Sequence, residues 1–236
     1  MAAVIHQTGV VVGQMAVDRK TNEITVAQPL LSPLDLVGHV VTADAMHTQQ
    51  DFARYLIEQK HADYVLTVKD NQPRLKKHLA QPAWDSPPQA AILQKGHGRI
   101  EQRRIWVSTA LRGSRWFSHV EQCFRIERET TDLQGGPLCR EYAYGVTSCL
   151  PEEASPEDLL HFVQGHWGIE NKVHWVRDVT FDEDRSQIRT GNGPQTMATL
   201  RNLAVSLLRL NGHKNLAQAT RYYNAHRDHA LNLIGA

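Results

Sequence analysis

The 236-residue sequence is poor in cysteine and has no long hydrophobic run. Its three cysteines, Cys123, Cys139 and Cys149, form no C-x-x-C pair. An odd number without that motif favours reduced thiols in a cytoplasmic protein over a disulfide framework. No apolar run approaches the ~18 residues that a membrane span needs, and no signal-peptide pattern is present. We therefore expect no association with a membrane.

An excess of charge of one sign is also missing. The sequence has 26 Lys and Arg against 25 Asp and Glu, a net charge of +1, so any nucleic-acid role must depend on local basic patches. What is present is ordinary for a soluble globular protein, with 41% hydrophobic and 22% charged residues. The length suits one large domain or two small ones.

The first third of the chain alternates strand-like and helix-like segments, which is typical of a parallel α/β sheet. Short apolar runs bounded by polar residues predict strands, and apolar residues at helical spacing predict helices. The predicted elements are β-structure with a turn at 7–9 in residues 1–17, a helix from 21–23 to 31, a strand at 37–42, a helix at 48–58, a strand at 63–69 and a helix from Pro73.

Asp44 ends the apolar run at 37–42, which predicts a central strand that is buried on both faces. In open α/β sheets, ligands bind and catalytic side chains point at the carboxyl ends of such strands. The alternative is that Asp44 merely caps the following turn or helix. A second carboxylate at the same place would favour the functional role.

Residues 97–149 contain three β-like runs with alternating charged and apolar positions, separated by glycine-containing turns. They predict antiparallel strands with one solvated face. A phosphate-binding role for their arginines is the alternative to simple solvation. These arginines are Arg99, Arg103, Arg104, Arg125 and Arg128.

The stretch "SPEDLLHFVQGHWGIENKVHW" predicts a helix that is capped by Ser155 and has Pro156 at its first position. His166, Glu170 and His174 are four residues apart and should share one face. The row is consistent with a solvated polar stripe, with a zinc site, or with one carboxylate of an Mg²⁺ site whose partner is Asp44. The spacing alone does not decide among them.

Five stretches carry a resemblance to a known family, and they follow the family's order over nearly the whole chain. They are "KTNEIT", "VVTADAMHTQ", "ADYVLTVKDNQPRL", "HWGIENKVHWVRDVTFDED" and "IRTGNGPQTMATLRNLAVSLL". The chain resembles DDE-type insertion-sequence transposases of the H-repeat-associated kind, which are bacterial cut-and-paste enzymes. The resemblance implies an α/β fold with a ribonuclease-H-like core of mixed sheet and helices, interrupted by a β-rich insertion before the glutamate-bearing helix. The implied divisions are a core at 1–94, the insertion at 95–150, and the rest of the core with C-terminal helices at 151–236.

The same resemblance implies the site. Asp44 and Glu170 correspond to the second catalytic aspartate and the catalytic glutamate, which hold Mg²⁺ or Mn²⁺ for DNA strand cleavage and transfer. The tryptophans of this region are expected to fix the helix on the sheet, and Asp182, Glu183 and Asp184 to cap the next segment. The partner is double-stranded DNA at the element ends, in the bacterial cytoplasm and nucleoid, with a homodimer as an option. The residues assigned to DNA are Asn22, Lys69, Asn71, His166, Asn171, His174, Arg177, Arg185 and Arg189.

Two departures from the family pattern are visible. Gln164 stands where the family usually has arginine, which implies one phosphate contact fewer. The 236 residues also contain no Asp-Gly-Lys, the motif that carries the family's first catalytic aspartate. The expectation is an N-terminally truncated transposase without the first core strand, impaired in catalysis. The alternative is a non-catalytic DNA-binding remnant.

Overall fold

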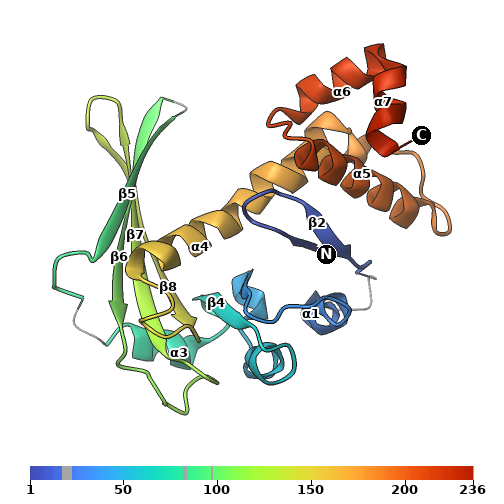
Figure 1. Ribbon diagram of the computed structural model, residues 1–236. Coiled ribbons are helices and arrows are strands. Elements are labelled where there is room, and N and C mark those ends of the chain that lie inside the picture. The colour runs from blue at the N-terminus through green and yellow to red at the C-terminus, as the bar shows by residue number, and fades with distance from the viewer. Residues whose placement is uncertain (18–22, 82–83, 97, 236) are drawn as a thin grey trace. The chain divides into compact units, whose positions relative to one another are not determined.

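The computed structural model describes residues 1–17, 23–81, 84–96 and 98–235, with the backbone alone at 170 and 171. The chain divides into two compact units, which are coloured along the sequence in Figure 1. One unit is Leu34–Gln164, and the other combines Met1–Pro33 with Gly165–Ala236. Each unit is described by itself below.

The unit Leu34–Gln164 is built on a six-stranded mixed sheet. Its spatial order is β3-β4-β8-β7-β6-β5, in which β3 and β4 are parallel and all other neighbours are antiparallel. Strand β4, the next strand after Asp44 in the sequence, pairs with β8. The strands of residues 97–149, which contain the arginines considered above, therefore belong to the same sheet as β4. The strands are β3 (Val40–Ala43), β4 (Asp63–Val68), β5 (Ala90–Gly96), β6 (Arg99–Ser108), β7 (Gln122–Asp132) and β8 (Pro137–Thr147).

The parallel pair β3 and β4 requires a crossover, which helical residues provide. A short 3₁₀ turn, η1 (Ala45–His47), leads to α2 (Gln50–Arg54), which continues as a π-helical turn, η2 (Tyr55–Gln59). The predicted helix at 48–58 is thus confirmed, and its apolar residues Phe52, Tyr55 and Leu56 are buried. Helix α3 (Pro73–Leu79) begins at the predicted proline.

The prediction that the strand before Asp44 is central and buried on both faces is wrong. Within the described residues, β3 is one of the two edge strands of the sheet, and all four of its residues are only half-buried. The physical reason is that β3 pairs with β4 alone and is only four residues long. The apolar run therefore predicts a strand, but it does not predict whether that strand is central or at an edge of the sheet.

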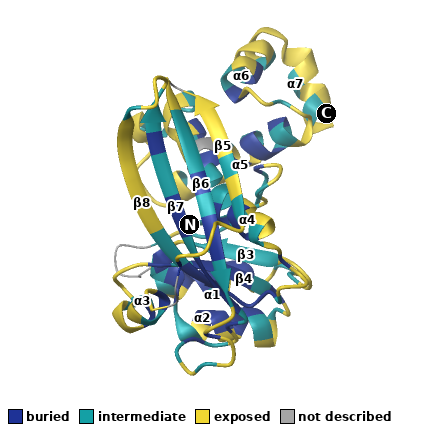
Figure 2. Ribbon diagram, turned by 90° about the vertical axis from the view of Figure 1, so that its left-hand side faces the viewer, coloured by how far each residue is buried: buried dark blue, intermediate teal, exposed yellow. Residues whose placement is uncertain are grey.

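The three predicted antiparallel strands are confirmed as β6, β7 and β8, and a further strand that was not predicted, β5, pairs with β6. The expected alternation between a solvated and a covered face fails at the start of β8. Residues 137–142 are all exposed, as the yellow part of β8 in Figure 2 shows. The last three residues of β8, where the strand also pairs with β4, are buried.

The arginines of this sheet bind acidic and aromatic side chains of the neighbouring strands. Arg104 contacts Glu127 at 2.5 Å and Glu129 at 2.9 Å, and hydrogen bonds from Arg140 and Arg104 lower the pKa of Glu129. The guanidinium of Arg125 lies 4.3 Å from the ring centre of Trp106, within cation–π range. Arg104 and Arg125 thus contact side chains of neighbouring strands, and the phosphate-binding role considered for these arginines stays untested.

The second unit begins with a hairpin of β1 (Ala2–Val4) and β2 (Val11–Gln14), which confirms the β-structure and turn predicted for the first residues. Gly9 has a φ of 73°, a conformation that glycine adopts without strain. Helix α1 (Glu23–Leu31) follows and buries Val26, Ala27, Leu30 and Leu31.

Helix α4 (Pro156–Ile169) crosses the boundary between the units and begins as predicted. The backbone N–H of Asp158 donates to the Ser155 hydroxyl at 3.2 Å, and the Asp158 carboxylate accepts from the Ser155 N–H at 3.0 Å. This reciprocal pair is a capping box, and its hydrogen bonds lower the pKa of Asp158. The helix continues as two π-helical turns, η3 (Glu170–His174) and η4 (Val176–Thr180).

The C-terminal segment is helical. Val176, Val205, Leu208, Leu216 and Ala219 form a buried apolar cluster at its centre. The helical elements are η5 (Glu183–Arg185), α5 (Gly193–Leu210), α6 (Leu216–Ala225) and α7 (Arg227–Ile234).

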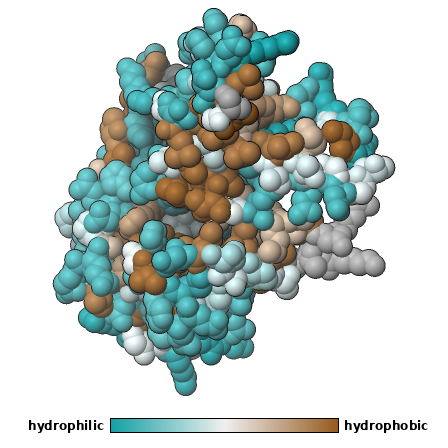
Figure 3. Space-filling model, turned by 45° about the vertical axis from the view of Figure 1, so that its right-hand side comes forward, coloured by the Kyte–Doolittle hydropathy of each residue, from teal (hydrophilic) through white to brown (hydrophobic). Residues whose placement is uncertain are grey.

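Within the described residues, no helix combines the length and the apolar character that crossing a membrane requires. The surface drawn in Figure 3 carries both hydrophilic and hydrophobic residues.

Candidate functional site

Asp44 stands at the carboxyl end of β3, immediately before the turn η1. Its side chain is exposed and its backbone is extended, with φ −59° and ψ 154°. It occupies the cap position of η1, but its side chain makes no capping hydrogen bond there. Asp44 therefore does not cap η1 through its side chain, which was the alternative to a functional role.

The end of β4 lies beside Asp44. The two strands are parallel with Ala43 opposite Leu66, so Lys69, Asp70 and Asn71 follow β4 at the same edge of the sheet. Lys69 is exposed, as its predicted contact with DNA requires, although that contact stays a prediction. Asp70 is also exposed, and its ion pair with Lys76 at 2.7 Å lowers its pKa.

Two neutral amides at this edge contact the turn after Asp44. The Asn71 Nδ2 donates to the carbonyl of Ala45 at 2.7 Å, and the Gln72 Nε2 donates to the carbonyl of Thr48 at 2.8 Å. The family resemblance implies a contact with DNA for Asn71, and no role was predicted for Gln72. No periodicity in the sequence signals such contacts, because the partners are 24 and 26 residues apart.

The segment that bears Glu170 is described through its backbone. Helix α4 changes to π-helical geometry at Glu170, and π-helical turns are frequent at functional sites. The side chains of Glu170 and Asn171 are not part of the description, and Asn22 lies outside the described residues altogether. Their predicted roles stay predictions.

His166 lies one turn before Glu170 and is half-buried against the β1–β2 hairpin. Its ring centre is 6.4 Å from that of His6, and the Lys172 Nζ donates to the His6 carbonyl at 2.5 Å. A Cβ at Gly165 would lie 2.5 Å from the His6 Nδ1, so glycine is needed for this close approach. The hairpin is thus docked on the helix next to Glu170, a contact that the sequence did not reveal.

The pH dependence of stability should report this docking. Burial, together with His166 and Lys172, lowers the pKa of His6 from 6.5 to about 4. Between these values the unfolded chain binds a proton that the folded chain does not, so stability falls as the pH decreases from 6.5 to 4. Because His6 is only partly buried, we expect His6→Gln to remove on the order of 1–2 kcal/mol of this loss.

Urea unfolding of the wild type and of His6→Gln, each followed at both ends of that pH window, measures the difference. His161→Gln is a matched control, because His161 projects from α4 with 59% of its side chain exposed. Equal pH dependence in the wild type and in His6→Gln would contradict the docked arrangement of His6.

His174 and Trp175 follow within the π-helical region, and both are exposed. The expectation that the tryptophans fix the helix on the sheet is wrong for Trp175, 54% of which is accessible. Val173 and Val176, its neighbours in the sequence, are buried instead. His166 and His174 thus differ in exposure, and their predicted contacts with DNA are untested.

Arg177 is held by an acidic neighbour. Its Nε and Nη2 contact both carboxylate oxygens of Glu183 at 2.6 and 2.5 Å, and Arg201 lies 3.9 Å from the same carboxylate. These partners raise the pKa of Arg177 and lower that of Glu183. Glu183 therefore does not act as a cap, which corrects the expectation for this residue. A bidentate arginine pair outweighs a local capping bond.

The remaining predicted DNA residues lie on the surface. Arg185 is 85% exposed and is 3.6 Å from Asp182, and Arg189 is exposed. Asp182 makes no side-chain capping hydrogen bond and has a φ of 48°, so its expected capping role is wrong as well.

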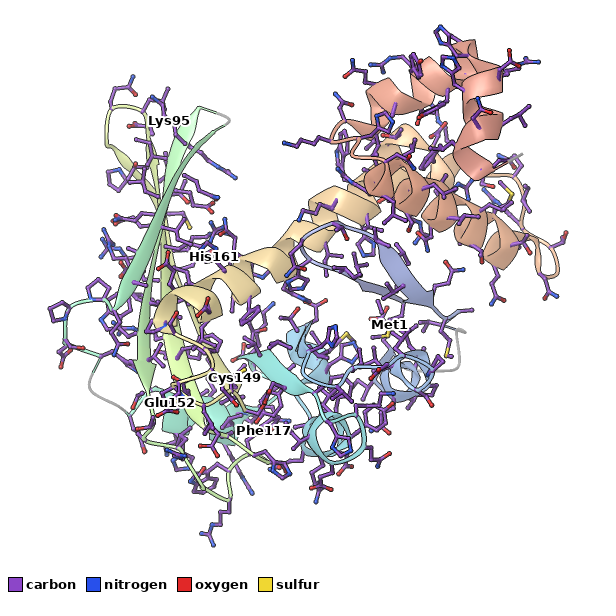
Figure 4. All side chains as sticks on the ribbon, viewed as in Figure 1. Met1, Lys95, Phe117, Cys149, Glu152 and His161 are labelled. Carbon is purple, nitrogen blue, oxygen red and sulfur yellow. The ribbon has the colours of Figure 1, made fainter. Side chains whose placement is uncertain are left out.

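Among the side chains that the structure describes, no group of three or more His, Cys, Asp or Glu could hold a metal ion. A separate cavity of about 340 Å³ lies beside the loop between β6 and β7. Phe117, which is labelled in Figure 4, lines it together with Gln50, Ser114 and His119. Among the described side chains, none of those predicted to bind metal or DNA lines this cavity.

Comparison with known proteins identifies the family. The sequence profile of the family described as "Transposase DDE domain" matches residues 1–207. The chain belongs to the DDE transposase family. It is 33% identical over 227 residues to "Putative transposase YncI" of Escherichia coli O157:H7, which covers 89% of this chain and 55% of that protein. It is 31% identical over 214 residues to "H repeat-associated putative transposase YhhI" of Escherichia coli strain K12, with 84% and 54% covered.

These matches confirm the resemblance seen in the sequence motifs. The chain spans about half the length of the curated relatives it matches. Among solved structures, a piggyBac transposase in a synaptic complex with hairpin DNA covers 91% of this chain and 42% of that chain. The sequence identity is 13% and the TM-score is 0.44.

Proposed function

We propose that this transposase family member contributes to metal-dependent cleavage and transfer of DNA strands, with Asp44 and Glu170 as two of the catalytic carboxylates. The observation that carries the proposal is the place of Asp44, an exposed carboxylate at the carboxyl end of the parallel pair β3 and β4, in a chain of the DDE family. Glu170 is assigned from its motif alone. A ribonuclease-H-like core with a β-rich insertion at 95–150 is part of the same proposal.

The chemistry of the donors fits the metal. Mg²⁺ prefers carboxylate oxygens at exposed sites where it can keep several waters and contact a phosphate. Asp44 meets these conditions, because its side chain is exposed and the side-chain amides of Asn71 and Gln72 contact the turn beside it. When bound, such ions activate the attacking hydroxyl and stabilise the leaving oxygen. Asp44 and Glu170 would hold them, and the exposed Lys69 would contact the DNA backbone.

The 236-residue polypeptide has only these two of the three acidic residues that the family pattern implies. A two-ion displacement needs both ions in position, so we infer that this polypeptide alone cleaves DNA poorly. DNA binding without catalysis is the second candidate for this polypeptide, because its 236 residues contain no Asp-Gly-Lys. The two candidates differ in whether adding that motif restores cleavage, which is the experiment that opens the Discussion.

Both candidates predict DNA binding that is sensitive to salt and largely blind to sequence. Lys69, Arg185 and Arg189 are exposed cations, and each phosphate contact releases counterions when it forms. We expect the affinity for a labelled duplex to fall at least tenfold between about 50 and 200 mM salt. Titration of two unrelated duplexes at both salt concentrations measures this.

A double variant, Arg185→Gln with Arg189→Gln, should flatten the salt dependence. Arg112→Gln is the matched control, because Arg112 is exposed but pairs with Glu121 at 2.5 Å in the other unit. Binding that is absent at low salt, or that does not change with salt, would count against both candidate functions.

A further inference from the structure

The turn that follows Asp44 is tied to the end of the neighbouring strand by three side chains. From the β4 side, Asn71 donates to the Ala45 carbonyl at 2.7 Å, and Gln72 donates to the Thr48 carbonyl at 2.8 Å. The same Gln72 nitrogen also lies 3.2 Å from the Gln49 Oε1. In the opposite direction, the Thr48 hydroxyl donates to the carbonyl of Thr67, a β4 residue, at 2.6 Å.

The turn also has internal hydrogen bonds. The N–H of His47 donates to the Asp44 carbonyl at 2.8 Å, and the N–H of Thr48 donates to the Ala45 carbonyl at 3.0 Å. Thr48 is completely buried, and Ala45 is 4% exposed. The backbone beyond Asp44 is therefore fixed at both ends, although the Asp44 side chain itself is exposed.

The strand that carries Asp44 needs such support. Strand β3 has four half-buried residues and pairs with β4 alone, whereas β4 has β3 on one side and β8 on the other. An edge strand of this length does not by itself hold a side chain within the ~0.5 Å that a metal site requires. The hydrogen bonds from Asn71 and Gln72, which follow the internal strand β4, therefore restrain the turn after Asp44.

We propose that Asn71 and Gln72 are positioning residues that fix the turn 45–48 and, through it, the carboxylate of Asp44 for metal binding. The proposal rests on the proposed function of Asp44. Neutral amides suit this task, because a lysine or arginine there would compete with the metal for the carboxylate. The contact with DNA predicted for Asn71 involves other atoms and is a separate prediction.

The first test measures the turn itself. In Asn71→Ala, and in Gln72→Met, which keeps the length of the side chain but removes its donor, amide hydrogen exchange at residues 45–48 should accelerate about five- to tenfold. Exchange in β6 and β7 should stay unchanged. Gln134→Ala is the matched control, because Gln134 is an exposed amide in the β7–β8 turn. Unchanged exchange at 45–48 in both variants would overturn the proposal.

The second test measures metal binding without DNA. Fe²⁺ with ascorbate and peroxide cleaves a polypeptide next to the bound ion, so the full 236-residue chain should be cut near residue 44. The Fe²⁺ concentration at half-maximal cleavage should rise about 10- to 100-fold in Asn71→Ala and Gln72→Met. Asp44→Asn should remove the cleavage, and Gln134→Ala should leave the midpoint unchanged.

The outcomes separate the two proposals. Absent cleavage in the wild type, or cleavage that survives in Asp44→Asn, would overturn the proposed metal role of Asp44 and the positioning role that rests on it. Cleavage that needs Asp44 but has the same midpoint in both amide variants would overturn the positioning role alone. A raised midpoint with faster exchange and an unchanged melting temperature would support both.

A further pair of variants keeps the test decisive if Gln72→Met does not fold. Thr48→Val keeps the shape of the buried side chain and loses the hydroxyl donor to Thr67, whereas Thr48→Ser retains that donor. The raised Fe²⁺ midpoint should appear in Thr48→Val and be largely absent in Thr48→Ser. Equal midpoints in the two variants would contradict a role for these hydrogen bonds.

Discussion

The 236-residue polypeptide should leave DNA intact in the presence of Mg²⁺ or Mn²⁺, whereas a longer protein that carries an upstream Asp-Gly-Lys segment should nick it. The added segment carries the Asp-Gly-Lys motif that the family pattern implies and that these 236 residues do not contain. In the extended protein, Glu170→Gln and Asp44→Asn should each lower the nicking rate by more than about a hundredfold, the upper range for changes in the outer shell of a metal site. Loss of a direct carboxylate ligand should have the larger effect.

Matched variants separate chemistry from folding and binding. Glu170→Gln keeps the shape of the side chain, so duplex binding at low salt should stay close to that of the unmodified protein. Glu152→Gln serves as the control, because Glu152 is an exposed carboxylate before α4 and far from Asp44 in sequence. Nicking by the short polypeptide that Glu170→Gln abolishes would refute the need for a third carboxylate. Inactivity of both lengths would favour the DNA-binding remnant.

The elements of this fold could be predicted from the sequence where the determining interactions are local. The cap at Ser155 and the proline after it identified the start of α4, since a capping box involves residues only three apart. The helix between β3 and β4 followed from the spacing of Phe52, Tyr55 and Leu56. Local patterns of this kind depend little on the rest of the chain.

The place of each element in the sheet could not be predicted in the same way. Strand β3 looked central because its residues are apolar, yet its position depends on pairing with β4 alone. The carboxyl-end position of Asp44 was nevertheless predicted correctly, because it requires only that a strand ends there. Parallel pairing, unlike strand identity, depends on contacts between residues about 23 positions apart.

The same distinction between local patterns and long-range contacts applies to the candidate site residues. Family motifs pointed to Asp44 and Glu170, but the motif letters do not say what each side chain contacts. Arg177 was expected at DNA and is paired with Glu183, and Gln72 had no assigned role although it contacts Thr48. Long-range polar contacts of this kind have no periodic signature, so only the structure reveals them.

The largest expected effect on stability is at Gly145, in the middle of the sheet. Gly145 lies in β8 opposite Phe124 of β7 and Thr67 of β4. A Cβ there would overlap Cζ of Phe124, whose side chain is fully buried, and would lie 2.8 Å from the backbone carbonyl of Leu66. We expect Gly145→Ala to destabilise the protein by about 3 kcal/mol, the upper end of typical overpacking costs.

Gly96→Ala is the matched control for this change. Gly96 also lies in a strand, β5, and a Cβ there would meet nothing within 4 Å. Because glycine is unfavourable within a strand, Gly96→Ala should be neutral or stabilising by up to about 1 kcal/mol. The melting temperature should therefore fall by roughly 6–12 °C in Gly145→Ala and stay level or rise slightly in Gly96→Ala.

A double variant identifies the cause of the destabilisation. Phe124→Leu removes the ring atoms nearest to the new methyl group, so Gly145→Ala should cost less in that background than in the wild type. Relief should be incomplete, because the Leu66 carbonyl belongs to the backbone of β4 and cannot move aside as a side chain can. If Gly145→Ala and Gly96→Ala melt at the same temperature, β8 cannot lie between β4 and β7 at this register. The edge that carries Asp44 would then lose its connection to the rest of the sheet.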